Sequence, residues 1–541
     1  MRKACFVVTI LLASLSVSFA QSWQDTLTVI DQLCSRYQPD RPGCQLSISR
    51  YGKLIYSKAW GMADMERQVP LTNSSIIEAG SVSKQFTAAA VLLLEQQQKL
   101  SLQDNIRKYV PELPIYHYPI TISQLMHHTS GLRDWGAIAQ LAGWPRTTKT
   151  YSNADALQII SEQKGLNNIP GGKFIYSNSN YNLLAIIVQR VSGMSLAEFT
   201  RKYIFIPAGM VHTQWRDDFK RVVANRALAY SVDEGQFKTE MPNENAYGNG
   251  GLLTTTEDLL KWNEYYWSGQ FGTPSLLAKL IEPDRFIDGS LNPYGAGLFI
   301  SRRYGLEFIQ HSGATASYRA MLERFPQLGL SIAWLSNSAQ FDTASTNLIV
   351  EVEKLFIKEV SPNEDTSDPS PSHPIVVPLA RLEKYAGEYQ SGMTGNISFT
   401  IADKRLAFDD QALVPLNATQ FKWREGTLDF TEINEVTYIN PPFDRFTFYK
   451  VDSTEAANDL YLGTYYSDEV KTSFTVQLKN GKLLLYQAPA NDNPIIAINK
   501  DHFMVPNLRA DLRFVKSKTG QVVQFTITTA RAFNIKFTKV K

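Results

Sequence analysis

The chain contains 541 residues, of which 44% are hydrophobic and 20% are charged, and its formal net charge is +2. This composition is typical of a globular protein, and the length allows two to four domains. Residues 1–20 hold two basic and no acidic side chains, so the remainder carries 52 basic and 52 acidic side chains. Nothing in this balance resembles a nucleic-acid-binding protein, which needs a clustered excess of positive charge.

The first twenty residues predict an export signal. Arg2 and Lys3 form a basic start, residues 6–15 are apolar, and Ser18-Phe19-Ala20 resembles a cleavage site. The apolar stretch is too short to span a bilayer, and no later segment reaches the roughly 20 apolar residues that a transmembrane helix needs. We therefore expect an exported protein, periplasmic or extracellular and without a transmembrane segment. A retained membrane anchor is the alternative.

Two cysteines, Cys34 and Cys44, follow the signal. In an oxidising compartment they either pair, closing a short loop between a first helix and a first strand, or remain buried thiols. The three cysteines and seven histidines of the whole chain show no metal-ligand spacing. We expect no metal and no other cofactor.

The order of the predicted elements indicates an α+β domain. Residues 44–50 and 53–61 alternate apolar and polar side chains around Tyr51-Gly52, as a hairpin does. Three more strands and a helix are predicted near the other end of this part, at 306–311, 317–325, 330–337 and 343–358. Helical patterns fill the stretch between, for example at 83–98, at 181–191, and at 196–203 behind a Ser195/Glu198 capping box.

Strands at both ends with helices between predict one antiparallel sheet with a large helical insertion. A cleft between the sheet and that insertion is where we expect a ligand.

A segment rich in Ser, Pro and Asp, "SPNEDTSDPSPSHP" at 361–374, has the composition of a linker. Beyond it "YAGEYQS" at 385–391 recurs as "YLGTYYS" at 461–467, and short alternating segments follow each copy. This pattern predicts an all-β region, either one barrel-like unit made of two related halves or two separate small domains. The predicted domains are a signal peptide (1–20), an α+β domain (21–360), a linker (361–378) and a β region (379–541) with repeats at about 379–452 and 453–541.

The stretch "AGSVSKQF" at 79–86 places Ser81 and Lys84 three residues apart at the head of an apolar helix. On its own the S-x-x-K pattern is weak, because it arises roughly once or twice by chance in a chain of this composition. An exposed helix start is the simple interpretation.

Two further elements follow in a fixed order. The first is Tyr176-Ser177-Asn178, ahead of a helical segment, and the second is His311-Ser312-Gly313, at the end of a predicted strand. Taken alone, Tyr176 reads as a core tyrosine, Asn178 as a helix cap and His311 as a structural histidine. Framework segments such as "HTSGL", "GGLLTTTEDL" and "IFIPAGM" lie between or beside them.

This ordered set closely resembles the penicillin-binding-protein and class C β-lactamase superfamily of serine hydrolases, over roughly residues 25–358. The resemblance implies that Ser81 is the nucleophile and that the backbone N–H groups of Ser81 and Ala314, beside Gly313, form an oxyanion hole. It further implies a small-molecule or peptide substrate. The β region after a linker resembles the architecture of D-aminopeptidases.

The residue types fit this chemistry. A serine hydroxyl needs a neighbouring base, and Lys84 lies one turn along the same helix face. A lysine is a poor base unless burial or another cation lowers its pKa, and a phenol such as Tyr176 ionises only beside a cation. Lys84 and Tyr176 both remain candidates for the proton acceptor. Asn178 is expected to hold Lys84 in place and to donate to a substrate carbonyl.

Other polar residues have weaker expected roles. His127 and His128 are expected in the framework near the cleft, whereas Arg133, Asp134 and Trp135 are candidates to line it. A literal Lys518-Thr519-Gly520 copies the third motif of many β-lactamases, but it lies between two alternating runs in the β region and predicts a turn.

The third motif is therefore assigned to His311-Ser312-Gly313. A histidine is mostly neutral near pH 7, which weakens recognition of a carboxylate, although Arg319 on the next strand is a candidate to restore a cation. This pattern resembles D-aminopeptidases and esterases more than dedicated β-lactamases. We expect an exported serine hydrolase acting on esters or amides. The alternatives are a true β-lactamase or DD-peptidase, which acts on carboxylate-bearing substrates, and a non-catalytic cell-wall-associated binding scaffold.

Overall fold

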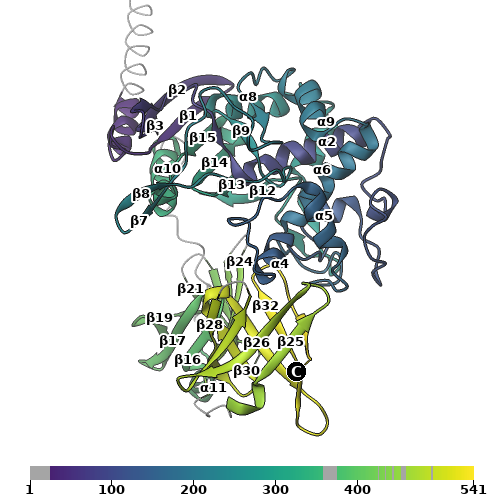
Figure 1. Cartoon of the computed structure of the whole chain (residues 1–541). Coiled ribbons are helices and arrows are strands. Elements are labelled where there is room, and N and C mark those ends of the chain that lie inside the picture. Colours follow the sequence, from purple (N-terminus) through teal and green to yellow (C-terminus); the bar gives the residue numbers. More distant parts are fainter. Residues whose placement is uncertain are drawn as a thin grey trace, which may run out of the picture.

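The computed structural model describes residues 25–357 and 375–540, apart from short gaps at 424–425, 433, 441–443, 453–457 and 489–490. The predicted export signal and the predicted linker segment 361–374 lie outside the described residues. In Figure 1 a domain of helices and sheet lies above two all-β units, and the chain colours show that these units come last in the sequence.

The first domain is built on a six-stranded antiparallel sheet, as the pattern predicts. Its two ends in the sequence meet in the middle of the sheet, where β1 pairs with β15 and Ile48 lies opposite Ile332. In spatial order the strands are β12 (Phe299–Arg303), β13 (Leu306–Thr315), β14 (Tyr318–Phe325), β15 (Leu330–Ser336), β1 (Cys44–Arg50) and β2 (Lys53–Trp60).

The long insertion between β2 and β12 contains most of the helices of the domain. They are α2 (Lys84–Gln96), α3 (Ile122–Met126), α4 (Trp135–Leu141), α5 (Asn153–Ser161), α6 (Asn178–Ser192), α7 (Leu196–Thr200), α8 (Thr256–Trp267) and α9 (Pro274–Ile281). The predicted capping box is present: Ser195 and Glu198 exchange hydrogen bonds at the start of α7. The predicted helix at 196–203 ends early, because a π-helical turn, Arg201–Phe205, replaces its last part.

Short strands bind the insertion together. They form the three-stranded sheet β5 (Ile77–Glu78), β9 (Leu252–Thr254) and β6 (Gln214–Trp215), and the two-stranded pairs β3 (Met62–Asp64) with β4 (Val69–Pro70), β7 (Tyr230–Asp233) with β8 (Gln236–Thr239), and β10 (Asp284–Arg285) with β11 (Leu291–Asn292).

Alternation along β15 divides the core between the two faces of the sheet. Ile332 and Trp334 pack with Leu348 and Val352 of α10 (Asp342–Ile357). The neighbouring residue Leu335 packs on the other face, in a cluster that includes α2, α6 and α8. The insertion therefore lies on one face and α10 on the other, which leaves the helix that follows Ser81 deep in the larger core.

The C-terminal region forms two nine-stranded antiparallel barrels, so the tail holds two separate β units rather than one. A short helix, α11 (Leu379–Tyr385), precedes the first barrel. The first barrel holds β16 (Gly387–Ser391), β17 (Gly395–Ala402), β18 (Arg405–Phe408), β19 (Gln411–Ala412), β20 (Val414–Pro415), β21 (Gln420–Trp423), β22 (Gly426–Asp429), β23 (Glu435–Asn440) and β24 (Asp444–Lys450). The second holds β25 (Gly463–Ser467), β26 (Thr472–Lys479), β27 (Lys482–Gln487), β28 (Asn491–Pro494), β29 (Ile496–Asn499), β30 (His502–Val505), β31 (Ala510–Lys516), β32 (Val522–Thr529) and β33 (Ile535–Lys539).

Both barrels close in the same way. The first strand of each barrel pairs with the last, and a single residue, Leu413 or Ile495, separates the two strands at the open edge. The repeated sequence has the same role in both: Tyr389 and Tyr465 are buried, and their hydroxyls donate to the carbonyl oxygens of Tyr385 and Tyr461 at 3.0 and 2.8 Å. The repeat detected in the sequence is thus a repeat of structure.

The second barrel packs directly against the first domain. Ile138 and Leu141 of α4 join the hydrophobic core of that barrel, and Figure 1 shows α4 above β32. The side-chain amide of Gln487 donates to the carbonyl oxygen of Leu141. The packing brings the connection between β32 and β33 next to the helical insertion.

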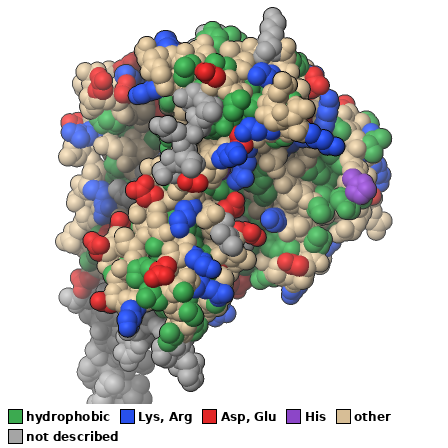
Figure 2. Space-filling view, turned by 90° about the horizontal axis from the view of Figure 1, so that it is seen from below, with side chains coloured by type: hydrophobic (Ala, Val, Ile, Leu, Met, Phe, Trp, Pro, Cys, Tyr) green, Lys and Arg blue, Asp and Glu red, His purple; other side chains and the backbone are tan. Residues whose placement is uncertain are grey.

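Three further observations concern the expectations from composition. Cys34 and Cys44 are buried free thiols. Over the described residues no single helix has the length and apolarity to cross a membrane, although α6 and Leu196–Phe205, bent by 76°, pass that test as a pair. Basic and acidic side chains are interspersed over the face in Figure 2.

Candidate active site

Ser81 lies in a tight turn that joins β5 to α2. Residues Gly80–Ser83 form a 3₁₀ turn, and α2 begins at Lys84 rather than at the predicted Ser83. Gly80 has a φ of +50°, and a Cβ there would meet the backbone nitrogen of Ala314 at 2.7 Å. Only glycine fits both constraints, so the turn carrying Ser81 is held against β13 by close backbone packing.

Lys84 is completely buried and makes three polar contacts. Its Nζ lies 3.2 Å from Ser81 Oγ, 3.0 Å from Asn178 Oδ1 and 2.5 Å from the carbonyl oxygen of Asn249. Burial, with a contribution from the charge of Arg531, holds the pKa of Lys84 well below its ordinary value of 10.5. The ammonium form of this side chain is therefore disfavoured.

Tyr176 lies beside this lysine. Lys84 Nζ is 4.8 Å from the centre of the Tyr176 ring, and the phenol interacts with the Ser81 hydroxyl. Burial raises the pKa of Tyr176 to about 12, although Arg531 and the hydrogen bond with Ser81 act in the opposite direction. The phenol keeps its proton at neutral pH.

Asn178 begins α6, and the carboxylate of Asp134 fixes this helix end. Asp134 Oδ2 accepts from the backbone N–H of Asn178 at 2.7 Å, while its Oδ1 accepts from the N–H groups of Gly136 and Ala137 at the start of α4. The one carboxylate joins the starts of two helices, which places the Asn178 amide at Lys84.

His311 is buried and neutral. Its Nδ1 lies 2.6 Å from the carbonyl oxygen of Ser312, and its Nε2 lies 3.0 Å from the hydroxyl of Tyr294. Because a carbonyl only accepts, Nδ1 carries the proton and Nε2 accepts from Tyr294. Burial, reinforced by the charge of Lys84, lowers the pKa of His311 to about 3. The third motif thus provides no cation at neutral pH.

Gly313 and Ala314 lie where β13 meets the Ser81 turn. A Cβ on Gly313 would lie 2.1 Å from the carbonyl oxygen of Ala79 and 3.0 Å from the backbone nitrogen of Ser81. The predicted strand continues past His311 to Thr315, because β13 and β14 stay in register up to the Thr315–Tyr318 pair. The H-x-G motif therefore lies inside a strand rather than at its end.

The structure thus brings together all seven predicted site residues. With other residues they line a cleft of about 1660 Å³ between the first domain and the barrels: Ser81, Tyr176, Asn178, His311, Gly313 and Ala314, with Lys84 buried behind them.

The other residues that were candidates to line the cleft lie in three different places: in the cleft, in the core and at the contact with the second barrel. Asp134 lines the cleft. Trp135 is a core residue whose indole N–H donates to Asn182 Oδ1 at 2.9 Å. Arg133 pairs instead with Glu469 of the second barrel at 2.7 Å. The guanidinium of Arg319, which lines the cleft, donates to two backbone carbonyls, those of Ala316 and Tyr318.

Both histidines of the His127-His128 pair are buried framework residues. The centres of the His128 and Tyr176 rings lie 4.3 Å apart, with the rings tilted by 35°. Lys518-Thr519-Gly520 forms the predicted turn: the N–H of Gly520 donates to the Ser517 carbonyl.

Two residues of the site escape prediction from the sequence. Asn249 reaches Lys84 through a backbone carbonyl, so its side-chain type gives no signal. Arg531, in the β32–β33 connection, places its guanidinium carbon 4.8 Å from the centre of the Tyr176 ring. Nothing in the β repeats marks this arginine, because its role depends on how the second barrel packs against the first domain.

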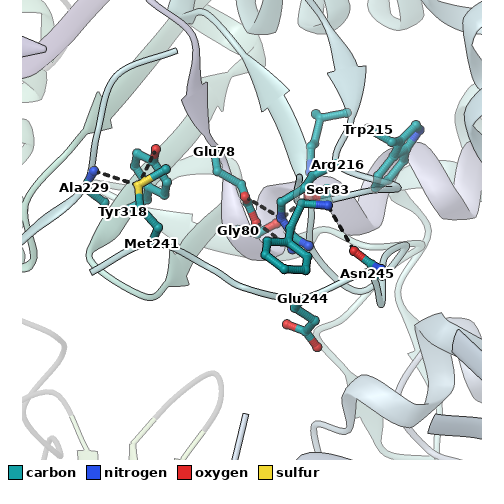
Figure 3. A network of polar contacts seen from close by, with 12 residues as sticks. Glu78, Gly80, Ser83, Trp215, Arg216, Ala229, Met241, Glu244, Asn245 and Tyr318 are labelled. Carbon is teal, nitrogen blue, oxygen red and sulfur yellow. Dashed lines mark hydrogen bonds and ion pairs between the residues drawn. The ribbon is translucent and has the colours of Figure 1, made fainter. Parts of the chain in front are cut away.

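Behind the Ser81 turn lies a buried polar network, shown in Figure 3. Arg216 Nε donates to Glu78 at 2.9 Å, and both side chains are buried. In the same network the sulfur of Met241 accepts from the N–H of Ala229 and from the hydroxyl of Tyr318. The network ties the strand that precedes Ser81 to distant parts of the insertion.

Comparison with known proteins gives a family match over most of the first domain. The beta-lactamase family model matches residues 25–352. Penicillin-binding protein 4* of Bacillus subtilis is 26% identical over 432 residues, covering 75% of this chain and 92% of that protein. A D-aminopeptidase of Gluconobacter oxydans is 29% identical over 325 residues, which span 58% of this chain and 60% of the relative.

Solved structures show the same fold. The octameric penicillin-binding protein homologue from Pyrococcus abyssi aligns with a TM-score of 0.53 and 18% identity, over 95% of this chain and 99% of that one. The D-amino acid amidase from Ochrobactrum anthropi SV3 aligns with a TM-score of 0.53 and 21% identity, over 62% of this chain and 99% of its own. Because the family model covers more than half of the sequence, this chain belongs to the beta-lactamase family.

Proposed function

We propose that the protein is a serine hydrolase that forms an acyl-enzyme on Ser81 and hydrolyses esters or amides of small molecules or peptides. The observation that carries the proposal is the 3.2 Å contact between Ser81 Oγ and the buried amine of Lys84. Membership of the beta-lactamase family and the relatives named D-aminopeptidase support the same reaction class.

The partners of Lys84 favour it as the proton acceptor. Asn178 Oδ1 and the Asn249 carbonyl only accept hydrogen bonds, whereas Ser81 Oγ is also a donor. A neutral amine has two N–H groups for the two acceptors and one lone pair for the serine proton. Because burial already disfavours the ammonium form of Lys84, the resting site fits a neutral lysine poised to deprotonate Ser81.

Acylation of Ser81 then proceeds as follows. Lys84 Nζ takes the Ser81 proton as Oγ bonds to the acyl carbon, and the carbonyl oxygen becomes an oxyanion. The backbone N–H groups of Ser81 and Ala314, which close packing at Gly80 and Gly313 holds together, are the proposed donors to that oxyanion. Collapse of the intermediate expels the amine or alcohol, which takes up the proton.

Tyr176 is the proposed relay for that proton. Its phenol is protonated at neutral pH, and it lies beside both Ser81 and Lys84. It donates its own proton to the leaving group and regains one from the Lys84 ammonium. A water molecule, deprotonated by the same lysine, then hydrolyses the acyl-enzyme and restores Ser81.

Covalent labelling tests this proposal. The full chain and its Ser81→Ala variant are treated with a fluorophosphonate and a fluorescent penicillin, and intact mass is measured. We expect one adduct on the parent and none on the variant. Ser74→Ala is the matched control, because Ser74 is exposed and lies outside the cleft, and it should label like the parent.

Two results would overturn the proposal. Labelling of Ser81→Ala to the same extent as the parent would place the nucleophile elsewhere. A folded parent that neither labels nor turns over an ester, a D-amino-acid amide or a β-lactam would identify a binding scaffold.

We also propose that the protein is exported, on the strength of the basic start, apolar stretch and cleavage site within residues 1–20. Expression in a bacterium, cell fractionation and N-terminal sequencing test it. Export predicts a mature chain that begins at Gln21 outside the cytoplasm, and an intact N-terminus in the cytoplasmic fraction would contradict it.

A further inference from the structure

The connection between β32 and β33 is anchored to the first domain on both sides of Arg531. The Arg531 carbonyl accepts from the backbone N–H of Asp134 at 3.1 Å and from Asn167 Nδ2 at 3.0 Å. Two residues on, the Phe533 N–H donates to Asn167 Oδ1 at 2.8 Å, and its carbonyl accepts from Arg133 at 3.0 Å. These bonds fix the backbone of residue 531 at the rim of the cleft.

A buried ion pair strengthens this anchor. Arg133 and Glu469 lie 2.7 Å apart with side chains only 4% and 10% exposed, and Glu469 Oε1 also accepts from the N–H groups of Lys164 and Gly165. A buried ion pair with several further hydrogen bonds holds a defined geometry. The second barrel therefore packs on the first domain in one specific position, and Arg531 has a defined position.

The side chain of Arg531 points its charge toward the reacting groups. Its guanidinium carbon lies 4.8 Å from the centre of the Tyr176 ring, and Tyr176 in turn contacts Ser81. Arg531 is exposed to the cleft. Among the described residues, no carboxylate forms an ion pair with it.

Several other charged or ionisable groups of the cleft are already engaged or carry no charge. Arg146 pairs with Glu244, and Arg319 donates to backbone carbonyls. The Asp134 carboxylate is held by three N–H groups. His311, from the third motif, is neutral at physiological pH. Arg531 thus lies against the Tyr176 ring with its charge available to a ligand.

We propose that Arg531 is the receptor for a carboxylate of the substrate, so that the C-terminal barrel selects acyl donors that carry a carboxylate close to the scissile bond. This inference rests on the proposed hydrolysis at Ser81. It assigns the selectivity to a residue outside the domain that holds Ser81 and outside its three motifs. A guanidinium suits this role because its planar N–H groups match the two oxygens of a carboxylate.

Matched substrates test the assignment. One pair is the thioester of N-acetyl-D-alanine with thioglycolic acid and the corresponding thioglycolamide, which differ by a carboxylate on the leaving group. The other is the 4-nitrophenyl ester of glutaric acid and that of valeric acid, which differ by a carboxylate on the acyl group. kcat and KM are measured on the full chain and on Arg531→Gln, Arg531→Lys and Lys536→Gln, at a pH where the rate no longer varies with pH.

In at least one pair the parent should prefer the carboxylate-bearing member. Arg531→Gln should lose about 10- to 100-fold in kcat/KM on that member, which is the usual cost of a charge-assisted hydrogen bond, and much less on the neutral one. Arg531→Lys should keep part of the preference. Lys536→Gln removes a positive charge from the same hairpin at a residue outside the cleft, and it should retain the parent values.

Three results would overturn the inference. They are a parent with no preference in either pair, an Arg531→Gln variant that keeps the preference, and equal losses on both members of a pair. The last would mean that Arg531 acts through Tyr176 or Lys84 rather than on the substrate. Failure of the proposed function looks different: no substrate would be hydrolysed and Ser81 would not be labelled, and the inference would fall with it.

Discussion

Glu78 and Arg216 form an ion pair that is closed off from water three residues ahead of Ser81. The side chains are 0% and 1% exposed, and the Nε and Oε2 atoms lie 2.9 Å apart (Figure 3). Arg226 approaches the same carboxylate at 3.6 Å. Removing one partner of such a pair leaves a buried charge without compensation, which is far more costly than losing an exposed pair.

Replacement of Glu78 by Gln should therefore lower the free energy of unfolding by about 3–5 kcal/mol. Urea unfolding of the full chain measures this. Asp233→Asn is the control, because the Asp233–Lys238 pair is 59% and 58% exposed, and it should cost at most about 1 kcal/mol. If the two substitutions lowered the free energy of unfolding equally, burial of the Glu78 pair would contribute nothing to stability.

The contact between the second barrel and the first domain gives a second prediction. Glu469→Gln should destabilise the contact between the barrel and the first domain by about 3 kcal/mol, because Arg133 would stay buried without its partner. The neighbouring Asp468 is the matched control: it pairs with Lys164 at 3.5 Å with both side chains about two-thirds exposed. Hydrogen exchange in residues 529–534 is the measurement. We expect faster exchange in Glu469→Gln and unchanged exchange in Asp468→Asn, and the reverse order would refute the assignment.

The protonation states at Ser81 predict the pH dependence. If Lys84 must be neutral to accept the serine proton, kcat/KM rises with pH and levels off once this amine is deprotonated. Because burial lowers the pKa of Lys84, that rise should lie well below pH 10.5. The pKa of Tyr176 is raised to about 12, so ionisation of the phenol should cause no fall in rate at lower pH.

The profile is measured with an ester after subtraction of spontaneous hydrolysis, in the parent and in Tyr176→Phe. A rising limb near neutral pH that is lost in Tyr176→Phe would contradict this assignment. It would make the phenolate, not the amine, the proton acceptor.

Close packing at Gly313 predicts a steric effect. A methyl group there would lie 2.1 Å from the carbonyl oxygen of Ala79, so β13 and the Ser81 turn must separate in Gly313→Ala. A displacement of about 1 Å costs on the order of 100-fold in rate. Labelling kinetics at Ser81 measure the loss. In Gly250→Ala the new methyl group meets nothing closer than 3.8 Å, so this control should fold normally, and a Gly313→Ala variant as reactive as the parent would disprove the packing argument.

Much of the fold follows from local patterns in the sequence. The hairpin around Tyr51-Gly52 and the capping box at Ser195 depend on neighbouring residues, and both occur where expected. The limits of β13 do not follow from neighbouring residues, because pairing with β14 extends the strand to Thr315. Likewise, whether the tail forms one barrel or two depends on which distant strands pair.

The active site likewise has features that the sequence motifs predict and features that depend on packing. The order of the Ser81, Tyr176 and His311 motifs indicates that these residues meet. Their protonation states do not follow from the motifs, since the neutral His311 results from complete burial beside Lys84. Arg531 is 450 positions from Ser81 in the sequence, and only the packing of the second barrel on α4 brings it to Tyr176.

The anchored connection between β32 and β33 also bears on how the protein is made. Ser81 and its lysine are synthesised first, and the segment that borders their cleft follows about 450 residues later. A nascent chain that lacks the second barrel lacks one wall of the cleft. The proposed selectivity of Arg531 therefore requires that the β32–β33 hairpin has been synthesised and packed on the first domain.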